Sequence, residues 1–271
     1  MLFERNISPI ILIRGGGDLA SGAALRLHRA GFRVIITELP GPLVVRRMAS
    51  FAQAVFDGAC ILEEVKGVLV SSPEEARNAL DRGEVAVAID PDLQMVKSLE
   101  VFAVVDGRML KEKTDSDIAA FSHIIGLGPG FTVGQNCHAV IETNRGPFLG
   151  RVYWKGNAER DTGIPESVRG FDVERVLYSP DEGILREKAS IGEVLEANDL
   201  IAEVDGAEVR AKFKGVLRGL IHDGLRVKKG MKIGDLDPRS DPRLCTLASD
   251  KALAIGGGVL EAVVIMLSEQ K

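Results

Sequence analysis

The sequence predicts an α/β chain in which a sheet of mainly parallel strands is joined to a small all-β module. Three observations lead to this prediction. The branched apolar run Ile10–Ile13 passes directly into a glycine cluster that opens an amphipathic helix. Several later apolar runs end in acidic or polar residues, as the buried strands of a parallel sheet do. From Tyr178 onward the predicted strands become short, and Gly, Asp and Lys become frequent.

The glycine cluster fits the pattern G-x-G-x-x-A through Gly15, Gly17 and Ala20. Gly15 would permit a tight turn, Gly17 would let the backbone approach a phosphate, and Ala20 would let the helix pack closely on the sheet. Asp18 argues against a phosphate there, because a carboxylate inside the loop would repel it. The alternative is a tight turn without a ligand. The candidate cofactor-binding residues of this Rossmann-like turn are Arg14, Gly15, Gly16, Gly17 and Asp18.

The second predicted strand, Phe32–Glu38, ends in an acidic residue at the position where dinucleotide-binding units accept ribose hydroxyls. The alternative is that Glu38 only solubilises a strand end. Two arginines, Arg46 and Arg47, follow shortly after this strand and could clamp a ribose phosphate or another anion. Their alternative is a solvated surface. We include Glu38, Arg46 and Arg47 among the candidate binding residues.

Further predicted strands cover Val65–Val70, Val85–Ile89 and Val101–Val105, and Ser72-Pro73 marks a helix start between the first two. Carboxylates follow several of these strands and could converge on a metal ion, but such acids more often cap helices and turns. The sequence therefore predicts no metal site. The acids considered are Asp90, Asp92, Asp106, Asp115 and Asp117.

A second passage from strand to glycine occupies residues 123–131, where the amides of Gly128 and Gly130 could form another anion site. The next predicted strand begins at His138 and ends in a cluster of polar groups, which is typical of a ligand edge in an open α/β sheet. The candidate binding residues from this strand end are Glu142, Asn144 and Arg145.

The last part of the chain contains a third glycine run, Gly256–Gly258, which we interpret as a turn opening an apolar C-terminal helix. This helix is too apolar to lie in water, so we expect it to pack back on the α/β domain or on a second subunit. Lys251 together with the glycine amides could hold another phosphate or carboxylate. The alternative is a tight turn before a packing helix.

The second half contains an internal repeat with an offset of 32 residues, in which Gly183-Ile184-Leu185-Arg186 aligns with Gly215-Val216-Leu217-Arg218. The repeat resembles the half-motif of biotinyl/lipoyl-type barrel-sandwich domains. The hairpin that carries the modified lysine in those carriers would lie near Asp205-Gly206, where this chain has no lysine, so no covalent biotin or lipoate is expected. The predicted domains are 1–176 (Rossmann-like, nucleotide-binding), 177–240 (barrel-sandwich module) and 241–271 (glycine turn and packing helix).

Composition and charge restrict the protein's surroundings. The net charge of −5 gives no bulk attraction to nucleic acid or anionic membranes. The three cysteines are widely spaced, form no C-x-x-C pair and are typical of a reducing compartment. Residues 1–8 lack the features of a secretory signal, and no apolar run of the sequence suggests a membrane span. These observations predict a cytoplasmic protein without nucleic-acid or membrane partners.

Several motifs together resemble the YqeB family of selenium-dependent molybdenum hydroxylase system proteins. They are Arg14–Gly22, Glu38-Leu39-Pro40 with Arg46-Arg47, Ile125–Phe131, Glu142–Gly146 and Asp250-Lys251 with Ile255–Gly258. The resemblance covers almost the whole chain in order, although Pro147 stands where we expect a polar residue. It implies a role in the maturation of molybdenum hydroxylases, either in handling molybdopterin cofactor or in inserting sulfur or selenium. The first half also resembles XdhC-type maturation factors, which implies a pterin dinucleotide by analogy.

The sequence therefore predicts an accessory protein that binds a nucleotide-containing cofactor, such as molybdopterin or its dinucleotide form. Its partners would be the hydroxylase apoenzyme or other maturation proteins, and a homodimer is left open. One alternative is an NAD(P)-dependent oxidoreductase that uses the same glycine turn. Another is a non-catalytic scaffold that docks a client enzyme. No catalytic residues can be assigned from the sequence.

Overall fold

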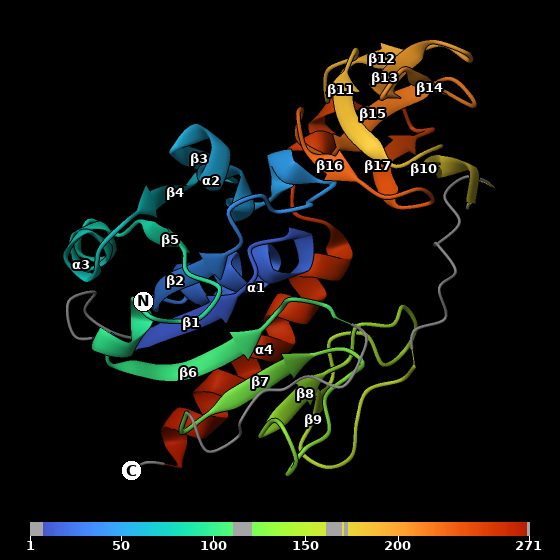
Figure 1. Cartoon of the computed structure of the whole chain (residues 1–271). Helices are drawn as coiled ribbons and strands as arrows, with labels where there is room; N and C mark the ends of the chain where they lie inside the picture. The colour runs from blue at the N-terminus through green and yellow to red at the C-terminus, as the bar shows by residue number, and fades with distance from the viewer. Residues whose placement is uncertain (1–7, 111–120, 161–169, 171–172, 270–271) are drawn as a thin grey trace. The chain divides into compact units, whose positions relative to one another are not determined.

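The computed structural model describes residues 8–110, 121–160, 170 and 173–269. The chain forms two compact units (Figure 1). The first contains Met1–Pro40, Phe51–Asp161 and Ala248–Lys271, and the second contains Gly41–Ser50 and Thr162–Leu247. Gly41–Ser50, which we predicted in the first domain, thus belongs to the second unit by its contacts, as do residues 241–247, which we predicted in the C-terminal segment.

The first unit is built on a nine-stranded sheet with the order β3-β4-β5-β2-β1-β6-β7-β8-β9. The seven strands from β4 to β8 are parallel, whereas both edge strands, β3 and β9, are antiparallel to their neighbours. The bounds are β1 Ile10–Arg14, β2 Arg33–Glu38, β3 Ala59–Leu62, β4 Val65–Val70, β5 Val85–Ile89, β6 Val101–Asp106, β7 Ile124–Leu127, β8 Ala139–Ile141 and β9 Val152–Tyr153.

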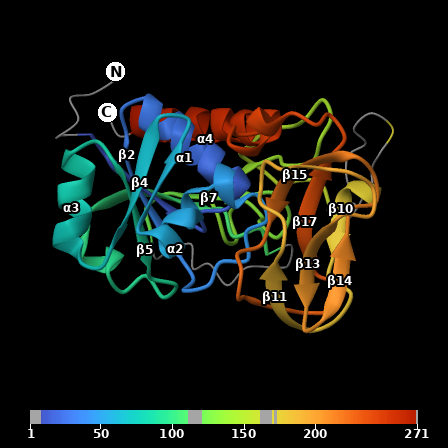
Figure 2. The same cartoon turned by 90° about the horizontal axis from the view of Figure 1, so that it is seen from above.

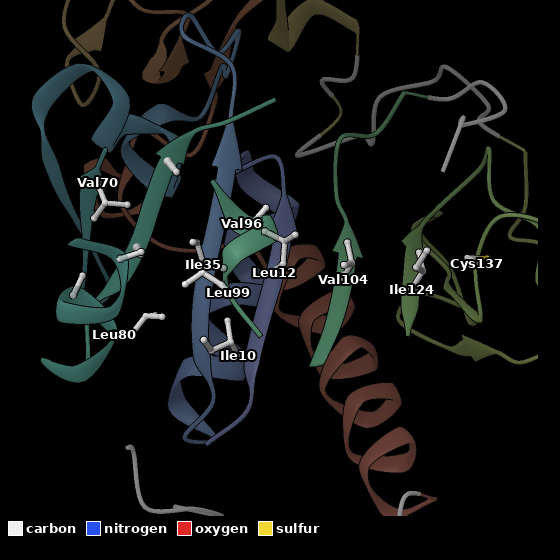
Figure 3. Packing of buried hydrophobic residues seen from close by; sticks show 14 of the residues in the cluster. Ile10, Leu12, Ile35, Val70, Leu80, Val96, Leu99, Val104, Ile124 and Cys137 are labelled. Carbon is white, nitrogen blue, oxygen red and sulfur yellow. The ribbon is translucent and has the colours of Figure 1, made fainter. Parts of the chain in front are cut away.

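Three longer helices cover this sheet. They are α1 (Asp18–Arg29), α3 (Pro73–Asp81) and α4 (Asp250–Ser268), and a single turn, α2, spans Ala54–Asp57. In Figure 2, α1 and α4 lie side by side on the sheet. One side of the sheet forms a core with α3, in which Leu12, Ile35 and Leu80 are almost fully buried (Figure 3). Alternate residues of each central strand, such as Ile11 and Ile13, are also buried, as expected for a sheet covered on both faces.

The start of α3 follows from the local sequence. Ser72 caps the helix by accepting a hydrogen bond from the Glu75 N–H at 3.1 Å, and Pro73 occupies the first turn, where its missing N–H costs nothing. The Ser71 N–H and hydroxyl both donate to the Glu75 carboxylate, which lowers the pKa of Glu75.

The second unit contains two four-stranded antiparallel sheets, with the orders β10-β17-β15-β12 and β14-β13-β11-β16. Their core includes Leu185, Ile201, Leu217 and Ile233. The strand bounds are β10 Val176–Tyr178, β11 Gly183–Glu187, β12 Val194–Leu195, β13 Leu200–Val204, β14 Ala207–Arg210, β15 Gly215–Leu220, β16 Arg226–Val227 and β17 Lys232–Asp237. Short 3-10 helices span Arg47–Ala49, Phe51–Gln53, Val96–Ser98, Val173–Arg175 and Pro242–Cys245.

The predicted fold, a Rossmann-like domain joined to a biotinyl/lipoyl-type module, is wrong. We expected a Rossmann-like parallel sheet and a biotinyl/lipoyl-type barrel-sandwich, but the structure has one large mixed sheet and two further antiparallel sheets. The copies of the repeat do not form one sheet each. The short strand β12 of the first copy pairs with β15 of the second, and β16 of the second pairs with β11 of the first. The α/β class itself holds for the first unit.

The glycine run Gly256–Gly258 does not open a helix. It lies inside α4, which begins at Asp250, six positions before Gly256, and the Ser249 side chain caps that start by accepting from the Ala252 N–H. The glycines serve packing instead, because a Cβ on Gly258 would overlap the carbonyl oxygen of Gly150. The prediction of a turn at this place is therefore wrong.

By length and composition alone, one helix within Pro242–Ser268 could cross a membrane. Its regular part, α4, buries one face against other elements of the first unit. This face includes Ala252, Ile255 and Val259. Core helices of soluble proteins have the same character. In its described part the chain looks like a soluble protein, and the cytoplasmic location stays a prediction.

Candidate functional site

The carboxyl ends of β1, β2 and β6 meet at one edge of the nine-stranded sheet. The register pairs Arg14 at the end of β1 with Thr37 of β2 on one side and with Asp106 of β6 on the other. The chain leaves β1 towards β2 and later returns to β6 on the opposite side of β1. Open α/β sheets bind ligands outside the strand ends at such a point, where the strand order reverses.

The glycine turn connects this edge to α1. Gly15 has a φ of +84°, which favours glycine, and its N–H donates to the Thr37 carbonyl at 2.8 Å. Gly17 is the N-cap of α1 and has an ordinary extended conformation, and no side chain caps the helix there. Asp18 is the first residue of α1. The first-turn N–H groups of α1 thus lie at the switch point of the sheet, where they favour a negatively charged group.

Glu38 is bonded to the glycine turn itself. One carboxylate oxygen accepts from the Gly16 N–H at 2.6 Å, and the other accepts from the Leu39 N–H at 2.9 Å. The residue is buried. Burial raises the pKa of the Glu38 carboxyl, although the two backbone hydrogen bonds oppose this effect. The sequence placed Glu38 near the turn, but it did not predict that the carboxylate would take one of the turn's N–H donors.

Two arginines flank Asp106 at the same edge. The Arg108 guanidinium donates to both Asp106 oxygens, with Nε–Oδ1 at 2.9 Å and Nη2–Oδ2 at 2.7 Å. Arg14 lies 3.6 Å from the same carboxylate. Asp106 is buried, whereas the side chains of Arg14 and Arg108 are 18% and 24% exposed. Each guanidinium is therefore partly open to solvent beside the glycine turn and can meet an anionic ligand.

The predicted pair Arg46 and Arg47 has its described partners within the second unit. Arg46 is buried and donates to the carbonyls of Leu244 and Leu247 at 2.9 and 2.8 Å. Arg47 donates to the Leu220 carbonyl at 3.1 Å and to the Glu187 carboxylate at 2.9 Å. These contacts anchor Gly41–Ser50 to the rest of the second unit. A role of either arginine in binding a ligand stays a prediction.

The second glycine passage follows β7. Gly128 has a φ of +73°, and a Cβ at this position would overlap the Thr143 hydroxyl, so β7 and β8 end in close contact. The Gly128 N–H donates to the Ile141 carbonyl at 2.9 Å, and the Gly130 carbonyl accepts from the Asn136 side chain at 3.0 Å. The Gly128 amide is thus already bonded within the sheet, which weighs against its use for an anion.

The polar groups after β8 hold one another. The Glu142 carboxylate is fully buried and accepts from the Asn144 N–H at 2.7 Å and the Glu159 N–H at 2.8 Å. Arg145 forms a bidentate ion pair with Asp250, with both distances at 2.8 Å. Lys251 follows Asp250 in the first turn of α4. Glu142, Asn144 and Arg145 organise this loop, and their contact with a ligand stays a prediction, as does that of Lys251.

Among the described residues, no group of three or more His, Cys, Asp or Glu side chains could hold a metal ion. Asp90, one of the acids considered, accepts from the N–H groups of Gln94, Met95 and Val96 and thereby organises a turn. Asp115 and Asp117 lie outside the described residues. Among the acids considered, Asp106 lies in the site, where its carboxylate pairs with Arg14 and Arg108.

Two residues of the site were missed from the sequence. Arg108 follows a strand end that we considered only for metal ligands. Ser21 lies on the buried side of α1, where its hydroxyl donates to the Gly16 carbonyl and accepts from the Phe51 N–H, both at 2.9 Å. In the sequence, Ser21 stands two positions after Leu19 within the predicted helix, and nothing there indicates such a role. The pairing of β1 with β6 shows that Arg108 belongs to the site, because it brings Asp106 beside Arg14.

The chain is 45% identical over 262 residues to the uncharacterized protein YqeB of Escherichia coli K12. The aligned part covers 96% of this chain and 48% of YqeB. This match supports membership of the YqeB family. The chain spans about half the length of YqeB, so the match does not carry the activity of the whole of YqeB. No family model matches the chain.

Solved structures similar to the chain include an aspartoacylase family protein from Mesorhizobium loti, with a TM-score of 0.28, 13% identity and coverage of 84% of this chain and 85% of that one. Another is the ectoine utilization protein EutE (DoeB) from Ruegeria pomeroyi, with a TM-score of 0.24, 12% identity and coverage of 84% and 86%. At these scores the matches carry no argument about chemistry.

Proposed function

We propose that the protein binds a nucleotide-containing cofactor at the carboxyl edge of β1, β2 and β6, and that it acts as an accessory protein in the maturation of molybdenum hydroxylases. The observation that carries the binding proposal is that Arg14 and Arg108 both lie at the Asp106 carboxylate, at the strand end from which the glycine turn leads into α1. Guanidinium groups and helix N-terminal amides are the donors that phosphates prefer.

The cargo follows from two further points. The resemblance to YqeB-type molybdenum hydroxylase system proteins implies a molybdopterin-type cofactor, and the chain is similar to about half of the uncharacterized protein YqeB. The donors at the sheet edge suit the phosphate of molybdopterin or the pyrophosphate of its dinucleotide form. The hydroxylase apoenzyme or another maturation protein would then receive the cofactor. The selenium-dependent branch of this system rests on the resemblance alone.

An NAD(P)-dependent oxidoreductase is the second candidate, because Glu38 at the end of β2 could accept hydrogen bonds from ribose hydroxyls. Glu38 is bonded to the Gly16 N–H, so a ribose would have to share or replace that contact. The two candidates differ in cargo and can be separated by binding. A scaffold that docks a client enzyme is expected to bind neither.

Isothermal titration calorimetry tests the proposal. The full chain is titrated with isolated molybdopterin, its cytosine dinucleotide form, CTP, NAD(H) and NADP(H). We expect saturable binding of the pterin cofactors that is tighter than binding of the nicotinamide nucleotides. Preference for NAD(H) or NADP(H) would support the oxidoreductase, and a lack of binding to every compound would leave the scaffold.

Variants of the edge locate the binding site. Arg108→Ala removes one guanidinium, and Gly17→Val adds bulk at the N-cap of α1 in a conformation that valine tolerates. Each is expected to weaken cofactor binding at least about tenfold. For Arg108→Ala this corresponds to one lost charge-assisted contact, whereas Gly17→Val acts through its added bulk. Arg77→Ala is the matched control, because Arg77 is exposed on α3 and bonds the Ser98 carbonyl. Unchanged affinity in Gly17→Val and Arg108→Ala would contradict the site.

A further inference from the structure

The backbone of Gly16 is held on both sides, through its N–H and through its carbonyl. Its N–H donates to Glu38 at 2.6 Å, and its carbonyl accepts from the Ser21 hydroxyl at 2.9 Å and from the Ala52 N–H at 3.0 Å. A Cβ on Gly16 would lie 3.0 Å from the Ala52 nitrogen and 3.1 Å from Ile36. The two peptide groups that flank the Gly16 Cα therefore cannot rotate without breaking bonds to Glu38, Ser21 or Ala52.

These partners lie where the chain passes between its two compact units. Pro40 is the last residue of the first unit before Gly41–Ser50, and Phe51 is the first residue after this segment. On the outgoing side, Glu38 bonds both the Gly16 N–H and the Leu39 N–H. On the returning side, the N–H of Phe51 bonds Ser21, and the next N–H bonds the Gly16 carbonyl. Both crossings are thus fastened to the backbone of one residue of the glycine turn, Gly16.

The segment between the crossings is fastened to the second unit. Arg46 and Arg47 donate to carbonyls of Leu244, Leu247 and Leu220, as described above. The Ser50 hydroxyl donates to the Arg46 carbonyl at 2.9 Å, so the residue before the returning crossing is bonded to one of these anchors. An unbroken series of bonds and covalent links therefore runs from Gly16 to the anchors of Gly41–Ser50.

We propose that the Gly16 backbone links occupancy of the glycine turn to Gly41–Ser50, so that a ligand at the turn regulates the second unit. The Gly16 N–H is a single donor, so an anionic ligand that binds it competes with the Glu38 carboxylate. The two negative groups also repel each other. Displacement of Glu38 also releases the Leu39 N–H, beside the outgoing crossing. Linkage is reciprocal, so a partner that holds Gly41–Ser50 changes ligand affinity by the same factor. The identity of the ligand rests on the proposed function. The linkage between Gly16 and Gly41–Ser50 consists of bonds within the chain and does not depend on that function.

The ligand-independent test uses Ser21→Ala in the full chain and amide hydrogen–deuterium exchange read by mass spectrometry. We expect exchange about fivefold faster at Phe51 and Ala52, as loss of one buried hydrogen bond predicts. We also expect faster exchange within Gly41–Ser50, which contains neither of the described partners of the Ser21 hydroxyl. Ser72→Ala is the matched control, since it removes a serine–backbone bond at the start of α3. It should leave exchange within Gly41–Ser50 unchanged.

If Ser21→Ala does not fold, Glu38→Gln serves the same purpose, because glutamine keeps the side-chain size but cannot accept from both Gly16 and Leu39 as a carboxylate does. A folded Ser21→Ala or Glu38→Gln protein with wild-type exchange throughout Gly41–Ser50 would overturn the linkage.

A ligand arm uses inorganic pyrophosphate as the probe. If calorimetry shows that pyrophosphate binds the wild-type chain, we expect its saturation to speed exchange at Leu39 and within Gly41–Ser50. Binding with no change in exchange there would contradict the linkage. Absence of any binding would count against the proposed function instead, and the variant experiment would still decide the linkage.

Discussion

Gly22 of α1 and Gly256 of α4 lie backbone against backbone where the two helices cross. A Cβ on Gly256 would overlap the Gly22 carbonyl oxygen, and a Cβ on Gly22 would overlap the carbonyl of Ala252. Glycine is unfavourable inside helices because it loses the most backbone entropy on folding. Its presence on both helices here is explained by the close approach, which places α4 on the helix that begins at the glycine turn.

Substitution at this crossing should therefore be costly. We expect Gly256→Ala to lower the free energy of unfolding by about 1–3 kcal/mol, the usual cost of overpacking, because the contact is with backbone that cannot move aside easily. Gly257→Ala is the control, since nothing lies within 4 Å of its added Cβ. It should instead raise stability by about 0.5–1 kcal/mol through helix propensity. Urea denaturation of both variants checks the pair, and equal effects would contradict the packing argument.

The parts of the fold that depend on local sequence were predictable. Ile10–Ile13 followed by glycines gave the first strand, turn and helix, and the second predicted strand ends at Glu38 as in the structure. The edges of the sheet were not predictable. The β3–β4 hairpin turns at Glu63 and Glu64, which both have positive φ, and neither residue type signals such a turn. Its cause lies in tertiary packing.

Long-range pairing limited the prediction of the candidate site in the same way. Arg108 becomes part of the site only because β6 pairs with β1, which no local pattern shows. Arg46 and Arg47 were placed near Glu38 by their sequence separation, yet their bonds lie with carbonyls far along the chain. Glycine runs were ambiguous as well, because turns and close helix packing both require a residue without a side chain.

Glu38 should make stability depend on pH. Burial raises the pKa of its carboxyl above the usual value, so the folded chain binds this proton more readily than the unfolded chain does. The contribution is fully present below the unfolded pKa of 4.5 and is lost as pH rises through the folded pKa. Glu38→Gln cannot titrate, so the stability of wild type relative to this variant should fall as pH rises above about 4.5. Urea denaturation from pH 4 to 7 measures this difference, and a pH-independent difference would contradict it.

His138 should have the opposite dependence. Its Nδ1 accepts from the Ile124 N–H at 2.9 Å, which requires a neutral ring, and the ring centroid lies 6.3 Å from that of His123. Burial lowers the pKa of His138, and the charge of His123 lowers it further. Its contribution to stability is present above the unfolded pKa of 6.5 and is lost as pH falls through the folded pKa. A nuclear magnetic resonance titration should give a pKa below 6.5.

His138→Asn provides the control for that titration, because the asparagine oxygen can replace Nδ1 as acceptor without taking up a proton. The acid-dependent loss of stability attributed to His138 should be absent in this variant. An identical pH profile in wild type and His138→Asn would show that the ring does not titrate in the way we expect.

Asp237 anchors the charged cluster of the second unit. It is fully buried, and its carboxylate binds Arg239 at 2.6 Å and Arg218 at 3.3 Å. Burial alone would raise the pKa of Asp237, but hydrogen bonds from Arg239 and the charge of Arg218 lower it to about 2. We expect Asp237→Asn to cost about 3–5 kcal/mol, because it removes one partner of a buried ion pair. Asp241→Asn, which removes the ion-pair partner of the exposed Arg243, should change stability little.

The pH dependence distinguishes this charge effect from a loss of shape. The depressed pKa means that the stabilisation by Asp237 is present above the unfolded value of 3.8 and is lost as pH falls from there towards about 2. The deficit of Asp237→Asn relative to wild type should therefore be largest above pH 4 and should shrink on acidification. Urea denaturation followed by circular dichroism between pH 2.5 and 6 measures it. A deficit that stays constant over this range would mean that asparagine disturbs packing rather than charge.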